Sequence, residues 1–160
     1  MKRYWITTHW PPARGDDVDA GVYLFEGRQD VGQNLAPGDL VWIYESRTGR
    51  KELGKKSNGF EGREGIVGLA ELITPLQPHN WPPTTYADGT TRHWRWYAAG
   101  EFVDRSGYID RQALNTILGY KEGYRLRGFG RRNSGLKEIE EDIHHQLQAA
   151  FVAGSQATCP

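Results

Sequence analysis

Aromatic residues gather where predicted strands end, and their chemistry suits the binding of a flat ring. Trp10 follows the first predicted strand, Tyr44 closes the second, and Trp94 and Trp96 lie in a later one. Trp and Tyr side chains combine a flat apolar face with one polar atom, so they can stack on a planar base or enclose a methylated group. The side chains that could add directional hydrogen bonds are Thr8, Glu45 and Ser46. The competing interpretation is a place in the core, which we favour for Trp5, Trp42 and Trp94.

Nucleophilic catalysis and metal binding find little support in the residue pattern. A nucleophile needs a base held against it, but the sequence contains no Gly-x-Ser-x-Gly elbow and Cys159 lies in the tail. His144 and His145 are adjacent on a predicted helix, so they point about 100° apart and cannot share an ion as an i, i+4 pair would. We therefore expect no catalytic residue, no metal site and no cofactor.

A glycine-rich segment offers a weak phosphate-binding pattern. Residues 128–135 precede a predicted helix start, where backbone amides together with Arg131 and Arg132 could hold a phosphate. The alternative is a plain connection whose arginines pair with Glu138 or Glu141. The residue pattern favours neither interpretation over the other.

Composition narrows the class of protein. The 160 residues fit one compact domain, which we place at 1–154, with 155–160 as a frayed tail. Twenty basic residues balance twenty acidic ones, which argues against a strongly basic nucleic-acid binder. The single cysteine indicates a reducing compartment. Because no run approaches the ~20 apolar residues that span a membrane, we expect a cytoplasmic protein with no membrane partner.

Period-two alternation predicts the strands that must position these side chains. The predicted strands cover residues 4–9, 39–44, 65–72 and 92–98, with 101–103 continuing the last of them. In residues 4–9, Tyr4 and Ile6 share one face, and in residues 92–98 Trp94 and Trp96 share one face. Residues 21–25 form a short strand or the approach to a helix, and residues 124–129 form a last strand.

Helical signals are fewer. Residues 29–35 are predicted to make one or two turns, and Asp110 is an N-cap for a helix that Gly119 ends. Ser134 is an N-cap for a final amphipathic helix that Gly154 ends. These elements together favour an α+β barrel of five to six mainly antiparallel strands with two to three flanking helices.

Four runs of residues, in this order, resemble an EVE domain of the PUA-like superfamily, whose relatives include YTH and ASCH domains. The matching runs are residues 4–8 (YWITT), 37–46 (PGDLVWIYES), 65–72 (GIVGLAEL) and 94–97 (WRWY). The chain departs from the family after its first strand, where residues 7–11 replace a Lys-Ser-Glu-Pro-like segment. The resemblance implies a PUA-like pseudo-barrel with a pocket for a modified nucleobase.

The resemblance also implies a function and a set of residues. Such a domain would flip a methylated or hydroxymethylated cytosine out of DNA and hold it between aromatic rings, as a noncatalytic reader that could serve modification-dependent restriction with an HNH nuclease. The implied base-pocket residues are Thr8, His9, Trp10, Tyr44, Glu45, Ser46, Trp94 and Trp96. The implied phosphate-binding residues are Arg47, Arg50, Lys51, Lys55, Lys56, Arg131 and Arg132.

Two alternatives remain open from the sequence. One is an RNA reader of the YTH or ASCH kind, which would prefer single-stranded methylated RNA. The other is an enzyme that acts on a small nucleoside or amide, as some ASCH relatives do. Such an enzyme would need a buried acid, and the candidates are Glu45 and Glu71.

Overall fold

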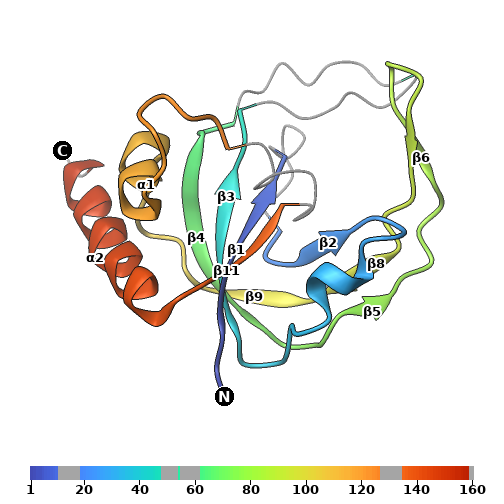
Figure 1. The fold of residues 1–160 in the computed structure, drawn as a ribbon, viewed down its shortest axis with the longest axis horizontal. Helices are drawn as coiled ribbons and strands as arrows, with labels where there is room; N and C mark the ends of the chain where they lie inside the picture. The colour runs from blue at the N-terminus through green and yellow to red at the C-terminus, as the bar shows by residue number, and fades with distance from the viewer. Residues whose placement is uncertain (11–18, 48–53, 55–61, 127–134, 159–160) are drawn as a thin grey trace.

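A six-stranded mixed sheet lies between two helices on one side and a smaller three-stranded sheet on the other (Figure 1). The computed structural model describes residues 1–10, 19–47, 54, 62–126 and 135–158, with side chains up to residue 154. No described helix is both long enough and apolar enough to cross a membrane. The described strands are divided among separate sheets rather than joined into one closed barrel.

The main sheet is built around a parallel pair of strands. β1 (Tyr4–His9) runs parallel to β3 (Leu40–Glu45), and on its other side β1 pairs antiparallel with β11 (Leu136–Ile139). β3 pairs antiparallel with β4 (Gly65–Leu72). The outer side of β4 carries two further antiparallel strands, β9 (Gly100–Asp104) and β10 (Ile109–Asp110). The predictions for the strands at residues 4–9, 39–44 and 65–72 are thus confirmed.

The remaining strands are short. β8 (Trp96–Ala98) lies between β2 (Val22–Leu24) and β5 (Gln77–Pro78) in the smaller sheet. β6 (Thr84–Thr85) and β7 (Thr91–Arg92) form a separate hairpin. Residues 29–32 form the 3-10 helix η1 (Gln29–Gly32), which confirms the predicted helical turn there.

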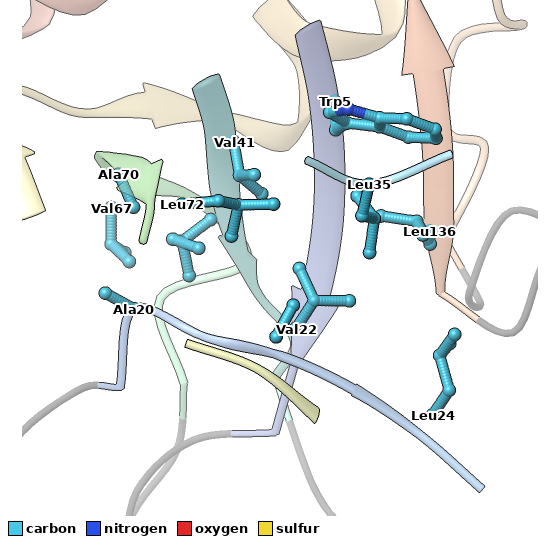
Figure 2. Packing of buried hydrophobic residues seen from close by; sticks show 12 residues of the cluster. Trp5, Ala20, Val22, Leu24, Leu35, Val41, Val67, Ala70, Leu72 and Leu136 are labelled. Carbon is cyan, nitrogen blue, oxygen red and sulfur yellow. The ribbon is translucent and has the colours of Figure 1, made fainter. Parts of the chain in front are cut away.

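Both faces of the main sheet are buried, and each face has its own core. Val41 and Ile43 point to the core shared with the smaller sheet, which we call the small-sheet face. Trp42 and Tyr44 point to the core under the helices, which we call the helix face. This division follows from the period-two alternation of a strand, and it explains why β3 is an almost uninterrupted apolar run. Figure 2 shows the small-sheet face, where residues from β1, β2, β3, β4 and β11 converge.

A buried carboxylate ties the start of β3 to the start of β1. The Asp39 carboxylate, 1% exposed, accepts hydrogen bonds from the backbone N of Arg3 (3.1 Å) and of Ala36 (3.1 Å), and from Trp5 Nε1 (3.0 Å). Three donors satisfy this buried charge, which would otherwise be costly. The contacts therefore set where the parallel pair of strands begins.

The two α-helices cover the helix face. α1 (Arg111–Leu118) begins at the N-cap Asp110, whose side chain accepts from Ala113 N at 2.7 Å, and it ends at Gly119 with φ of 75°. Both caps were predicted and both are confirmed, because their signals are local. α2 (Glu141–Thr158) continues past Gly154, so the prediction that Gly154 ends this helix is wrong.

The last part of the chain also differs from its prediction. Leu136 and Ile139 lie in β11, not in a helix capped by Ser134, and Ser134 itself is outside the described residues. Their i, i+3 spacing is typical of a helix face. In a strand the same spacing places them on opposite faces, and since both faces of this sheet are buried, both residues are apolar.

Two other strand predictions are wrong. Residues 92–98 do not form one strand, because residues 93–95 separate β7 from β8. β9 does not continue that strand either: β8 pairs with β2, whereas β9 pairs with β4, so the chain passes between the two sheets at Ala99. Residues 124–126 are not in a strand, and residues 127–129 lie outside the described part.

Candidate functional site

The carboxyl ends of β1 and β3 lie side by side because these strands are parallel. His9 is paired in register with Glu45, and Thr8 with Tyr44. Residues paired in register point to the same face, so His9 and Glu45 share the small-sheet face while Thr8 and Tyr44 are on the other. The structure therefore divides the predicted pocket residues of these strand ends between two faces.

Glu45 is almost fully buried at this end of the sheet. The residue is only 3% exposed, and its Oε1 accepts a hydrogen bond from the backbone N of Arg63 at 2.9 Å. A small cleft of 120 Å³ opens at this carboxylate and is lined by Glu45, Arg63, Val67 and Arg105. We call it the Glu45 cleft. It brings one buried carboxylate and two arginines to the same cleft.

Aromatic rings hold both arginines of the Glu45 cleft. The Arg63 guanidinium lies 4.2 Å from the centroid of the Tyr108 ring, and that of Arg105 lies 4.6 Å from the centroid of the Phe102 ring. The Tyr108 hydroxyl also donates to the backbone carbonyl of Arg63. The two cation–π contacts restrict long side chains that would otherwise be free in solvent, while the hydrogen bond holds the backbone of Arg63.

The local backbone explains why Arg63 reaches Glu45. A Cβ on Gly62 would lie 1.7 Å from the Ser46 carbonyl oxygen, so only glycine allows the chain to pass this close to the end of β3. Glu64 has a φ of 50°, in the left-handed region that is uncommon for residues other than glycine. A β-bulge between Ile43 and Tyr44 leaves Val67 of β4 as the extra residue, and Val67 lines the cleft.

His9 lies beside the Glu45 cleft on the same face. Its Nε2 donates to the Gly21 carbonyl at 2.7 Å, and its ring meets the Tyr23 ring edge-on at 5.9 Å. Burial lowers the pKa of His9, against the opposing effects of the Gly21 carbonyl and Asp19. His9 is therefore a neutral donor that anchors the segment before β2.

A first aromatic group, which we call the Trp10 cluster, consists of Trp10, Tyr86 and Trp94. The Trp10 ring is nearly perpendicular to the Tyr86 ring (82°, centroids 5.5 Å apart) and to the Trp94 ring (89°, 5.8 Å). Trp94 Nε1 donates to the Tyr86 hydroxyl at 2.8 Å. Tyr86 is buried, whereas Trp10 remains 37% exposed. The cluster thus exposes the Trp10 indole ring to solvent while Tyr86 and Trp94 pack against it.

Phe25 packs against the Trp10 cluster and contacts two arginines. Its ring meets the Trp94 ring edge-on at 5.9 Å. The guanidinium groups of Arg28 and Arg92 lie 5.6 Å and 4.9 Å from the Phe25 centroid. Positive charge therefore borders the exposed aromatic surface.

A second aromatic group was missed by the sequence-based pocket prediction. The Tyr23 ring stacks on the Trp81 ring (25°, 5.2 Å) and lies 4.8 Å from the Tyr97 ring, while His79 lies 3.7 Å from Trp81. The Tyr23 hydroxyl donates to Asp19, and burial first and then Asp19 raise the pKa of Tyr23. The signal that could have found this group is the alternation in β2, where Tyr23 is the outward residue between Val22 and Leu24.

The overall arrangement resembles that of several solved structures. A hypothetical protein from Leishmania major superposes with a TM-score of 0.56 at 13% identity, over 96% of each chain. Human THYN1, in complex with DNA containing 5-methylcytosine, gives 0.53 at 11% identity, over 92% of this chain and 96% of that one. Atu2648 from Agrobacterium tumefaciens gives 0.51 at 14% identity, over 99% and 97%. The chain has the fold of these proteins. The α+β fold class predicted from the sequence is thereby confirmed.

Comparisons at the level of sequence gave no match. No protein-family model matches the chain, and no curated protein sequence matches it either. The likeness to the solved structures therefore concerns the fold alone.

The other predicted pocket residues lie apart from the Trp10 cluster. Tyr44 is buried in the helix-face core, where burial, followed by the nearby Glu64, raises its pKa to about 12. Thr8 Oγ1 donates to the Gly135 carbonyl at 3.4 Å. Trp96 packs against the small-sheet-face core, and its buried Nε1 has no hydrogen-bond partner among the described residues. Ser46 is partly buried and follows Glu45 at the end of β3.

Of the predicted phosphate-binding residues, Arg47 lies within the described part of the chain. Arg47 is exposed, and its backbone carbonyl accepts from Gly62 N at 2.7 Å. The residues that lie outside the described part of the chain are Arg50, Lys51, Lys55, Lys56, Arg131 and Arg132. Cys159 also lies outside it. Among the described residues, no group of three or more His, Cys, Asp or Glu side chains is placed to hold a metal ion.

Proposed function

We propose that this protein binds DNA and reads a modified cytosine without catalysing a reaction. The observation that carries the proposal is the Trp10 cluster, where the exposed Trp10 indole at the end of β1 packs against Tyr86 and Trp94. An exposed aromatic ring at the rim of a folded domain is suited to stacking on a base. The proposal is supported by the fold shared with human THYN1, which was solved with DNA containing 5-methylcytosine.

The proposed mechanism is base flipping into the surface between the Trp10 cluster and the Glu45 cleft. Extruding a base from a duplex costs a few kcal/mol. Stacking on an aromatic side chain returns ~1–3 kcal/mol per base, so the remainder must come from hydrogen bonds to the base edge and from phosphate contacts. Arg28 and Arg92, which flank Phe25, are near enough to the Trp10 cluster to contribute phosphate contacts, together with the basic residues predicted from the sequence.

The test is a titration of fluorescent duplexes that carry cytosine, 5-methylcytosine or 5-hydroxymethylcytosine at one position. We expect tighter binding to one modified duplex, and Trp10→Ala to weaken that binding about 5- to 150-fold, as expected from the loss of one base–aromatic stack. A suitable control is Tyr124→Ala, since Tyr124 is also an exposed aromatic residue but follows α1 on the helix side. Equal binding to all three duplexes, unchanged in Trp10→Ala, would refute the proposal.

The same titration decides between DNA and RNA. Single-stranded RNA containing a methylated base serves as the competitor. If it displaces the modified duplex at lower concentration than unlabelled modified DNA does, the RNA-reader alternative replaces the DNA reader.

We further propose that the protein is the reader component of a modification-dependent restriction system, in which an HNH nuclease is a fused or associated partner. In that case the purified chain should bind a methylated plasmid and leave it uncut. Cleavage of the plasmid by the chain alone, in Mg²⁺ buffer, would contradict the noncatalytic assignment.

A further inference from the structure

We propose that the Glu45 cleft selects pyrimidines that carry an amino group at position 4, so that the protein distinguishes 5-methylcytosine from thymine. This inference rests on the proposed function, because it names how the same site chooses its base. Both bases carry the 5-methyl group. They differ at position 4, where cytosine has an amino group and thymine a carbonyl oxygen.

The size of the cleft suits the edge of one ring. Its volume is about 120 Å³, which is smaller than the cavity of about 150 Å³ that takes up a whole benzene molecule in another protein. Glu45 is paired in register with His9, the residue before Trp10, so the Glu45 cleft and Trp10 belong to the same end of the parallel strand pair. A base bound at this end of the sheet therefore has a cleft for its edge at the same end.

The polar groups of the cleft match the edge of cytosine. A carboxylate only accepts hydrogen bonds, and a guanidinium only donates them. Glu45 can accept from the 4-amino group, as acidic residues do in recognising cytosine, while Arg63 or Arg105 can donate to the ring nitrogen or to the 2-carbonyl oxygen. Thymine would place its 4-carbonyl oxygen against the Glu45 carboxylate, two acceptors with no proton between them. This repulsion is a means of rejecting the wrong base.

The surroundings of the cleft leave these groups available. Among the described residues, the Glu45 carboxylate accepts its hydrogen bond at Oε1, from Arg63 N. The nearby Glu64 is already engaged, since its Oε1 lies 3.5 Å from Arg111 Nη1. Arg63 and Arg105 contact aromatic rings, and neither has an ion-pair partner within the described part of the chain. The buried Glu45 is thus the acceptor that faces the cleft.

The experiment compares four bases at one position of a duplex: cytosine, 5-methylcytosine, uracil and thymine, each opposite an abasic site. The abasic site removes the difference in pairing energy, so the protein alone discriminates. We expect the wild type to prefer 5-methylcytosine over thymine by about 5- to 150-fold, the usual range for one good base contact. Glu45→Gln should reduce that ratio to less than about 3-fold, because an amide can both donate and accept.

Two further variants make the result specific. Glu71→Gln removes a charge from the same pair of strands at the opposite end, where Glu71 is in register with Leu40, and it should leave the ratio unchanged. If Arg105 donates to the 2-carbonyl oxygen, which both bases carry, Arg105→Gln should weaken binding to 5-methylcytosine and thymine alike. Arg105 is exposed, so this variant is expected to fold. Gln at position 45 keeps an oxygen for the Arg63 N–H, and a thermal melt checks that the variant folds.

The outcomes separate the inference from the function. If the wild type prefers 5-methylcytosine over cytosine but binds thymine equally well, the proposed function stands and the role of Glu45 is overturned. A ratio that persists in Glu45→Gln likewise overturns it. If the wild type binds all four duplexes equally, both proposals fail.

Discussion

His144 shows how a single buried side chain can make this fold sensitive to pH. The residue is 3% exposed, its Nδ1 accepts from Trp42 Nε1 at 3.0 Å, and its ring stacks on Tyr4 at 4.2 Å. Because the indole N–H can only donate, Nδ1 must be unprotonated. Burial first, and then His145, lower the pKa of His144. The folded state therefore requires the neutral imidazole.

This requirement predicts a loss of stability in mild acid. The unfolded chain takes up a proton near the ordinary histidine pKa of about 6.5, while the folded chain resists it, so the unfolded state binds more protons. The free energy of unfolding should thus fall as the pH drops from 7.5 to 5.5. His9, whose pKa burial also lowers, contributes in the same direction. Hydrogen bonds from Ser106 lower the pKa of Asp104 from its ordinary value of 3.8. Asp104 therefore affects the stability in stronger acid, outside the range from pH 7.5 to 5.5.

Urea denaturation at pH 7.5, 6.5 and 5.5 measures this effect. His144→Gln removes one titrating group and should make the pH dependence shallower than in the wild type. His145→Gln is the matched control: His145 is exposed on the same helix and is a smaller cause of the lowered pKa of His144 than burial, so this variant should change the slope less than His144→Gln does. Identical slopes for the wild type and His144→Gln would show that His144 is not held neutral.

At the scale of elements, the end of α2 packs on the segment before β10 through two glycines. A Cβ on Gly154 would lie 1.8 Å from the Tyr108 carbonyl oxygen, and a Cβ on Gly107 would lie 2.2 Å from the Phe151 carbonyl oxygen. Real Cβ atoms do not come this close to backbone atoms, so neither position accepts a side chain without a shift of the backbone. Gly154 is therefore a packing residue inside the helix. It brings α2 against Tyr108, the residue whose ring holds Arg63.

Gly154→Ala tests this account because two effects oppose each other. Helix propensity alone favours alanine by about 1 kcal/mol. Overpacking against a fixed backbone usually costs about 1–3 kcal/mol, and we expect this cost to exceed the gain from helix propensity. The free energy of unfolding in urea should therefore decrease. Ala153→Gly, at an exposed neighbour, is the control that reports propensity alone. An increase in stability for Gly154→Ala would contradict the close approach.

Across the whole molecule, the main sheet separates the core under the helices from the candidate site. The helix side buries Trp42, Tyr44 and Phe151. The small-sheet side carries the Glu45 cleft, and the Trp10 cluster lies with the strand ends. Since the formal net charge is zero, the DNA binding that we propose would depend on local basic groups and not on the field of the whole protein.

This distribution predicts a modest salt dependence of DNA binding with a local origin. Each phosphate contact contributes about −0.9 to the slope of log K against log salt concentration. If Lys55 and Lys56 contact phosphates, the double variant Lys55→Ala/Lys56→Ala should reduce the magnitude of the slope by about 2, equally for methylated and unmethylated duplexes. The control is Lys2→Ala/Lys121→Ala, which removes the same charge from two exposed positions elsewhere. Equal slopes for the two double variants would exclude Lys55 and Lys56 from the phosphate contacts.

Much of the framework follows from local signals in the sequence. β1, β3 and β4 were predicted because their apolar runs are bounded by turn residues, and α1 because Asp110 and Gly119 mark its ends. β11 could not be predicted in the same way, since its apolar spacing satisfies a helix as well as a strand that is buried on both faces. The break at residues 93–95 has no local signal either, because there the chain passes from the β6–β7 hairpin to β8 in the smaller sheet.

The sequence by itself determined which residues could bind a flat ring, and it marked Trp10 and Glu45 as members of the candidate site. Only the tertiary structure decided how these residues are grouped. Tyr44 and Glu45 are neighbours in the chain but lie on opposite faces, because successive side chains of a strand alternate. Arg63 and Arg105 join Glu45 from other parts of the chain, because a bulge, a close passage at Gly62 and two aromatic rings place them there. Such contacts depend on long-range packing, which no local pattern of residues encodes.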